Sequence, residues 1–191
     1  MHLFHTLTRP WRGAVRLLTA LAFTAGLLGL SGCASQGIEQ YAAERPTLDL
    51  ARYFNGKVLA HGIFQDRSGQ VVKRFTVDMD CRWEGNQGVL DERFTYSDGS
   101  TQRRIWKLTK EADGRYTGTA DDVVGMATGR TAGNAFQWSY VLKLPVDGSV
   151  YEVSFDDWMY LVDERVMLNK ATMSKFGVRL GEVTLSFQKL P

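Results

Sequence analysis

The strongest constraint on the fold comes from long stretches in which apolar and polar side chains alternate. The clearest is "VVKRFTVDMDCRW", residues 71–83, and a second is "NAFQWSYVLKL", residues 134–144. Successive side chains of a strand point to opposite faces, so each stretch presents one apolar and one polar face. In the first stretch the apolar row is Val71, Phe75, Val77, Met79, Cys81 and Trp83. Both stretches are therefore predicted to be long, half-buried antiparallel strands.

Turn-forming clusters divide the rest of the chain in the same manner. They read "QDRSGQ", "EGNQG", "SDGS", "EADG", "PVDGS" and "VDER", and runs rich in Val, Phe, Tyr, Trp and Thr lie between them. This pattern predicts an all-β domain over residues 56–191, with about nine or ten antiparallel strands in up-and-down order. A closed barrel is favoured because closure removes exposed strand edges, and a sandwich is the alternative. A barrel of this size is either filled by side chains or holds one small ligand.

The first residues have the features of an export signal. Three arginines and no acidic residue precede an apolar run over residues 17–30, which is too short to span a bilayer easily but suits a signal-peptide core. The run ends in Leu30-Ser31-Gly32-Cys33, which resembles the lipobox of bacterial lipoproteins. The resemblance implies cleavage before Cys33 and acylation of its thiol.

This resemblance divides the chain into three parts. Residues 1–32 would be the signal peptide, residues 33–55 the lipidated cysteine with a polar tether, and residues 56–191 the barrel. The residue after the cysteine is Ala34 rather than Asp, a pattern similar to that of lipoproteins sent to the outer membrane. We therefore expect a lipid-anchored protein on the periplasmic leaflet of the outer membrane.

Composition argues against several classes of function. Without residues 1–32 the net charge falls from +2 to about −1, which gives no basic surface for nucleic acid. His61 is the one histidine left, and no Cys/His ligand spacing is present. A Ser-His-Asp triad could use only His61, and no Gly-x-Ser-x-Gly motif accompanies it. Cys81 lies in an apolar row, as expected of a buried thiol. We expect no catalytic residues, no metal and no cofactor.

Two charges fall on an apolar face near residue 98. If "SDG" forms a three-residue turn with Gly99 in the left-handed conformation, Glu92 lies directly opposite Arg104. A two-residue turn at Asp98-Gly99 would instead set Glu92 against Ile105. The first register is favoured because it pairs both charges. Such a pair either fixes the register or holds a polar head-group inside a barrel.

The sequence "VSFDDWMYL" carries two adjacent carboxylates that look like an acid–base pair. Neighbours on a strand point to opposite faces, so Asp156 is predicted outside and Asp157 inside. A buried carboxylate needs a partner. With "VDER" as a four-residue loop Asp157 faces Lys170; with a loop one residue shorter it faces Ala171, and Asn169 lies opposite Met159.

Most of the chain resembles an uncharacterised family of Gram-negative lipoproteins classed as a domain of unknown function. The resemblance is carried by "YFNGKVLAHGIFQDRSG", "ADDVVGMATGRTAGNAFQWSY", "DDWMYL" and "KFGVRLGEV". It implies a lipocalin-like outline, although Gly56-Lys57-Val58 departs from the Gly-x-Trp of true lipocalins.

Two functions follow as expectations. The first is a non-enzymatic binder of a small amphipathic molecule, whose cavity would be lined by Glu92, Arg104, Asp157, Lys170 and Asn169. The alternative is a structural or assembly accessory of the envelope, with a filled barrel and an apolar surface near Trp158 and Tyr160.

Overall fold

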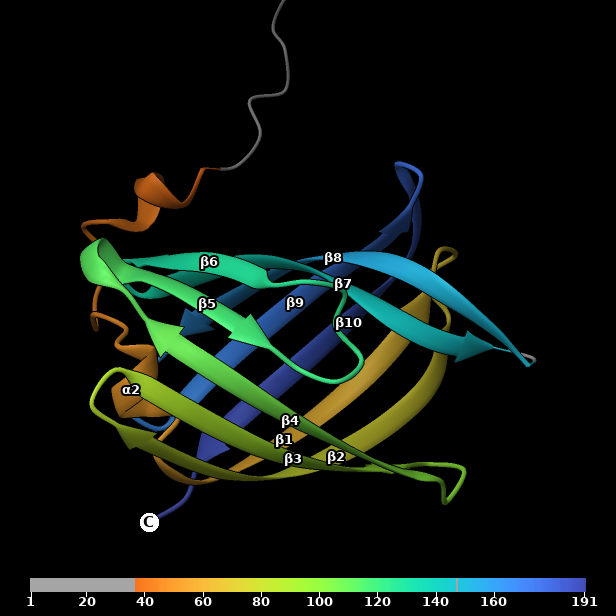
Figure 1. Ribbon diagram of the computed structural model, residues 1–191, viewed down its shortest axis with the longest axis horizontal. Helices are drawn as coiled ribbons and strands as arrows, with labels where there is room; N and C mark the ends of the chain where they lie inside the picture. Colours follow the sequence, from red (N-terminus) through yellow and green to blue (C-terminus); the bar gives the residue numbers. More distant parts are fainter. Residues whose placement is uncertain (1–36, 147) are drawn as a thin grey trace, which may run out of the picture. The chain divides into compact units, whose positions relative to one another are not determined.

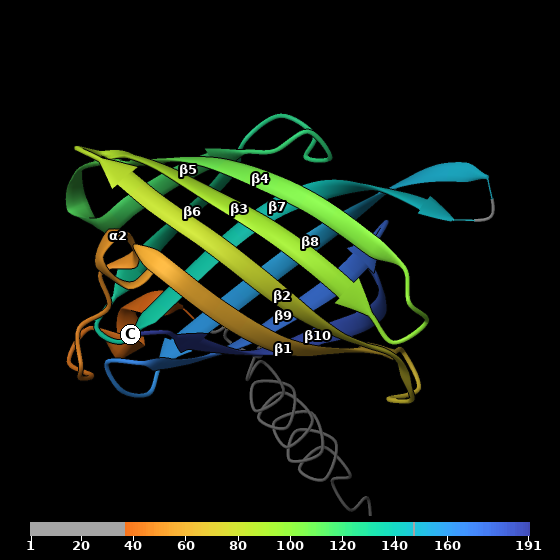
Figure 2. The same cartoon turned by 90° about the horizontal axis from the view of Figure 1, so that it is seen from below.

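The computed structural model describes residues 37–146 and 148–191, which form a closed antiparallel barrel (Figure 1 and Figure 2). The ten strands are β1 Gly56–Asp66, β2 Val71–Glu84, β3 Gln87–Tyr96, β4 Thr101–Lys110, β5 Arg115–Thr119, β6 Ala127–Ala132, β7 Ala135–Val146, β8 Ser149–Leu161, β9 Val166–Lys175 and β10 Val178–Lys189. Each strand pairs with its neighbour in sequence, and β1 pairs with β10 from Val58↔Lys189 to Asp66↔Gly181. This last ladder closes the sheet, so the predicted barrel is confirmed and the sandwich is wrong.

One end of the barrel is closed by the segment that precedes β1. A 3-10 helix η1 (Ile38–Tyr41) and a one-turn helix α2 (Leu50–Tyr53) form there, and α2 lies across the end of the barrel (Figure 1). A third short helix, η2 (Ala112–Gly114), lies between β4 and β5. The side chains of Leu48, Leu50 and Phe54 are almost fully buried against the barrel core. These residues are therefore part of the folded domain, because their apolar side chains join the barrel core.

Polar contacts fix α2 at this end. Asp49 accepts hydrogen bonds from the first backbone N–H groups of the helix, which would otherwise lack partners, and it pairs with Lys110 of β4 at 2.9 Å. At the other end of the helix, Lys189 donates to two backbone carbonyls, and the indole of Trp83 donates to the carbonyl of Phe54 at 2.9 Å. Because these contacts come from three strands, α2 is a fixed floor rather than a loose cover.

The wall is incomplete beside β5 and β6, which are the shortest strands. The β4–β5 ladder uses only Lys107–Lys110 of β4, so the half of β4 nearest Thr101 extends beyond it. The connection 120–126 follows β7 instead, through Val124 N–H to Val141 O and Lys143 N–H to Asp122 O, each at 2.8 Å. Here the first half of β4 and the 120–126 connection face each other without a backbone ladder. A side-chain contact, described below, joins them instead.

Large side chains crowd the half of the barrel next to α2. Trp106 and Trp138 pack with their ring centroids 4.6 Å apart, and Tyr116, Phe136 and Leu108 are fully buried beside them. Gly129 allows this packing, because a β-carbon there would overlap Trp138. The other half is more open, and the candidate cavity extends from it to the floor.

Candidate functional site: a cavity in the open half of the barrel

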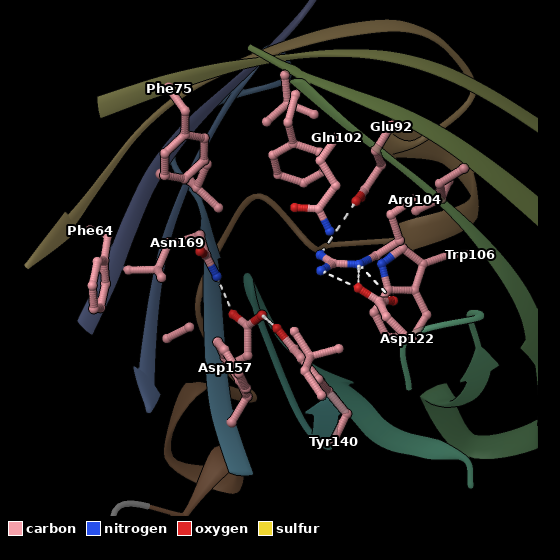
Figure 3. A pocket seen from close by; sticks show the side chains of 18 of the residues that line it. Phe64, Phe75, Glu92, Gln102, Arg104, Trp106, Asp122, Tyr140, Asp157 and Asn169 are labelled. Atoms are coloured by element: carbon pink, nitrogen blue, oxygen red, sulfur yellow. Dashed lines mark hydrogen bonds and ion pairs between the residues drawn. The ribbon is translucent and has the colours of Figure 1, made fainter. Parts of the chain in front are cut away.

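A cavity of about 730 Å³ extends from the floor residues Leu50 and Phe54 to Val146 near the opposite end. Its wall is mainly aromatic and aliphatic, with Phe64, Phe75 and other apolar side chains pointing inward (Figure 3). A small number of polar groups interrupt this wall. Some of these lie near the hairpins at the mouth, namely Lys73, Ser100, Thr101, Gln102 and Lys143. The deeper ones form two groups, one on β3, β4 and the 120–126 connection, the other on β7, β8 and β9.

The first group is centred on Arg104. Its guanidinium donates three hydrogen bonds to the carboxylate of Asp122, at 2.7 to 3.0 Å, and its Nη1 lies 4.0 Å from Glu92. Glu92 and Arg104 face each other across the β3–β4 ladder, as the three-residue turn predicts, with Gly99 at φ +83°. The sequence did not reveal Asp122, which is the main partner of Arg104.

The Arg104–Asp122 pair also contributes to the structure of the barrel wall. Arg104 belongs to the part of β4 beyond the β5 ladder, while Asp122 is tied to β7 through its backbone carbonyl. Two parallel N–H···O bonds of an arginine and a carboxylate are directional as well as strong. The pair therefore joins the two edges of the wall where the backbone ladder is absent.

The second group is centred on Asp157, which is 5% exposed. Its carboxylate accepts from the Tyr140 hydroxyl at 3.0 Å, from the Trp138 indole at 3.4 Å, and from the amide of Asn169. The Asn169 amide also donates to the carbonyl of Trp158 at 3.1 Å. Figure 3 shows Tyr140 and Asn169 pointing at Asp157 from either side. Three donors thus hold a carboxylate in an apolar wall.

Burial changes the acidity of these groups. It raises the pKa of Glu92 to about 7, and nearby Arg104 offsets only part of this rise. Burial likewise raises the pKa of Asp157 to about 6, against the lowering effect of its hydrogen bonds from Asn169, Tyr140 and Trp138. The pKa of Tyr140 lies well above its ordinary value because the hydroxyl is buried beside Asp157. Two carboxyl groups of the cavity therefore titrate near neutral pH.

Of the two residues predicted to lie near Asp157 inside the barrel, Asn169 is confirmed and Lys170 is wrong. The hairpin after β8 has the shorter of the two loops considered, with Asp157↔Ala171 and Met159↔Asn169 as partners. Asn169 is accordingly inside and bonded to Asp157, whereas Lys170 is outside and pairs with Glu182 at 3.0 Å. Placing Lys170 in the cavity was an error of one residue in register, which reverses the face of every side chain in a strand.

The remaining candidates lie outside the cavity wall. Asp156 faces outward and accepts from Gln137 and Trp158, so the two aspartates do not form a dyad. Cys81 is buried in the core as predicted, and His61 is exposed on β1. Cys33 lies outside the described residues.

Figure 2 shows the hairpins at the end of the barrel opposite α2. Several of these hairpins carry exposed apolar side chains. Phe176, at the β9–β10 turn, is 95% exposed at φ +51°, and Lys175 lies over its ring and that of Tyr151. This apolar rim consists of Val71, Val72, Val146, Val150, Tyr151, Phe176, Val178 and Leu180. By contrast, the predicted apolar surface at Trp158 and Tyr160 is partly covered by the ring of Tyr41.

The described residues contain neither a group of metal ligands nor a membrane-spanning helix. Within residues 37–146 and 148–191, no three His, Cys, Asp or Glu side chains gather as a metal site would require. In the same part of the chain, no helix has the length and apolar character needed to cross a membrane.

Residues 27–189 match a family described as a protein of unknown function (DUF3833). The chain belongs to this family. Comparison with the curated proteins finds no match. Among solved structures, the barrel is similar to the S-type phycobiliprotein lyase CPES from Guillardia theta, with a TM-score of 0.57 and 7% identity over 82% of this chain and 99% of that chain. At this identity the likeness concerns the fold alone, a lipocalin-like closed barrel.

Proposed function

We propose that this DUF3833 protein is a non-enzymatic, lipid-anchored binder of a small amphipathic molecule. One observation carries the proposal: a cavity of about 730 Å³ that is mainly apolar and contains two small polar groups. Small-molecule sites are typically clefts of roughly 300–1,000 Å³ with apolar walls and a few polar groups that orient the ligand. The likeness to a lipocalin-like barrel agrees with this use of the interior.

The polar groups support binding rather than catalysis. Raised carboxyl pKa values also occur in catalytic acids. Here, however, Asp157 already accepts from three fixed donors, and Arg104 is committed to Asp122. No Ser, Thr, Cys or Lys side chain is among the described residues bonded to Asp157 or Arg104. Such groups orient a polar head without changing it.

The apolar rim supports a membrane-associated source for the ligand. Large exposed apolar patches on soluble proteins usually mark sites of interaction. This rim lies on three hairpins at the end of the barrel toward which the cavity extends, and Val146 belongs to both the rim and the cavity wall. An amphiphile could pass from a lipid surface into the cavity with little apolar surface exposed to water.

The alternative role, an envelope accessory acting through its surface, has less support. It expects a filled barrel, and the open half is hollow. It also expects an apolar surface at Trp158 and Tyr160, and Tyr41 packs there. The apolar rim around Phe176 is the remaining observation in its favour.

Native mass spectrometry of the protein purified from its own envelope tests the binding function. We expect a bound small molecule in the native protein and its loss in Val183→Trp, which fills the cavity from β10. Thr184→Trp, on the exposed face of the same strand, is the matched control and should keep the ligand. A native protein that carries no small molecule and is stabilised by none of a panel of amphiphiles would contradict the proposal.

The anchor is tested separately. Cys33→Ala should move the protein from the membrane fraction to the soluble fraction and abolish labelling by palmitate, because more than one acyl chain holds it to the leaflet. Cys81→Ala, which removes the other cysteine of the chain, should do neither. Retention of the Cys33→Ala protein in the membrane would count against lipidation at this residue.

A further inference from the structure

We propose that the cavity selects an amphiphile whose polar end is positively charged, such as a primary ammonium, and that Glu92 and Asp157 bind this end. The inference rests on the proposed binding function and names the chemical class of its ligand. It follows from the charges, the free hydrogen-bonding capacity and the depth of the polar groups in the cavity.

The balance of charge inside the barrel is acidic. Among the described residues that line the deeper part of the cavity, three are carboxylates (Glu92, Asp122 and Asp157) and one is a cation, Arg104. Three hydrogen bonds commit Arg104 to Asp122, and these two charges cancel. Two carboxylates remain without full compensation. A cationic head would offset both, whereas an anionic head at this depth would be repelled.

The cations near the mouth do not reverse this balance. Lys73 lines the cavity there, but its ammonium lies 3.1 Å from Asp98 and over the ring of Tyr96. Lys143 also borders the cavity, but its side chain is exposed and belongs to the outer face of β7. Among the described residues, neither ammonium forms an ion pair with Glu92 or Asp157.

The carboxylates also have room for another donor. No hydrogen bond to the Glu92 carboxylate is present among the described residues, and its nearest cation is 4.0 Å away. An ionised carboxylate offers about four acceptor positions, so Asp157 can accept a further bond beyond its three. Beside it, the side-chain oxygen of Asn169 is buried and accepts none from the described residues. An ammonium, which has three donors and no acceptor, matches this excess of acceptors.

The depth of the polar groups sets the orientation of the ligand. Glu92 pairs with Met79 on β2, and Phe75 lies two inward positions nearer the open end. Leu144 is likewise two inward positions beyond Tyr140 on β7. The apolar wall therefore continues from the polar groups toward the rim, so the head would lie at mid-depth and the chain would point to the mouth.

A matched set of amphiphiles tests the inference. Dodecylamine, dodecanol and dodecanoate share one chain length and differ in the charge of the head, and their binding to the full-length protein can be measured at pH 8 by calorimetry. We expect dodecylamine to bind about tenfold more tightly than dodecanol, and dodecanoate to bind most weakly. Glu92→Gln and Asp157→Asn should each reduce the preference for the amine about tenfold.

Two substitutions on the outer face serve as controls. Asp156→Asn changes the neighbouring carboxylate on β8, and Glu152→Gln changes an exposed one on the same strand; both should keep the preference. Equal or tighter binding of dodecanoate would overturn the charge selection while leaving the binding function intact. An unchanged preference in both interior variants, each shown to be folded by a cooperative unfolding curve, would do the same. Failure of all three amphiphiles to bind would overturn the binding function itself.

Discussion

The buried carboxylate of Glu92 should make the protein less stable as pH rises, and Glu92→Gln should remove this effect. In the unfolded chain the carboxyl has the ordinary pKa of 4.5, whereas burial raises the pKa in the folded protein to about 7. Between these values the folded state binds more protons than the unfolded state. Stability therefore falls as pH rises from about 4.5 to about 7, and it is constant above that range.

The size of the effect follows from the two pKa values. Each tenfold difference in proton affinity corresponds to about 1.4 kcal/mol, so the full loss from Glu92 is about 3 kcal/mol. Roughly 2 kcal/mol of this falls between pH 5 and pH 8. Asp157 adds a loss of the same sign, about 1 kcal/mol over that interval, because its pKa rises from 3.8 to about 6.

Urea unfolding at pH 5, 6, 7 and 8 measures these losses. We expect the free energy of unfolding of the native sequence to fall across the series and that of Glu92→Gln to fall by much less, so that the variant is the more stable protein at pH 8. Glu152→Gln, an exposed substitution of the same kind, should follow the native sequence within about 0.5 kcal/mol. Parallel curves for the native sequence and Glu92→Gln would refute the reasoning, because they would mean that Glu92 is not desolvated in the folded barrel.

Two further predictions concern the wall and the floor of the barrel. Arg104→Met leaves the partly buried carboxylates of Asp122 and Glu92 without their cation and should lower the free energy of unfolding in urea by about 3 kcal/mol. Arg103→Met breaks an exposed pair with Asp91 and should lower it by less than about 1 kcal/mol. Equal losses would contradict the role of the Arg104–Asp122 contact. Gly133→Ala places a methyl group against the carbonyl of Tyr41 at φ +53°, so it should detach the segment before β1, lower the melting temperature and speed proteolysis there. Gly125→Ala, at φ +68° with open space around it, should show only the backbone cost of about 1 kcal/mol, and similar proteolysis of the two variants would contradict the contact.

The parts of the fold that could be predicted are those set by local chemistry. Alternation over residues 71–83 gave the face of each side chain in β2, and the "SDG" turn fixed the β3–β4 register that brings Glu92 and Arg104 together. The number of strands, expected as nine or ten, and their up-and-down order follow from the same signals. In each case the information lies within one strand or one hairpin.

The parts that could not be predicted depend on contacts between distant segments. Asp122 lies in a connection without alternation, and its approach to Arg104 depends on the short β5 and β6 strands. An available signal was the guanidinium itself, since five donors are more than Glu92 can satisfy. The position of Lys170 failed for a different reason: the "VDER" hairpin allows two loop lengths, and the choice between them reverses the face. The burial of residues 48–54 could not be predicted, because it depends on the end of the folded barrel against which these residues pack.

The polar groups of the cavity oppose the stability of the barrel that contains them. Glu92 and Asp157 are desolvated in an apolar wall. Apolar side chains of similar size at these two positions would pack in the same wall without that desolvation cost. Local conflicts of this kind in an otherwise consistent sequence are expected at functional sites. A ligand that supplies a positive charge would remove the conflict, because it would favour the ionised form of both carboxylates and so lower their pKa values. Binding of such a ligand should therefore stabilise the folded barrel more at pH 8 than at pH 5, which is the reverse of the pH dependence of the empty barrel.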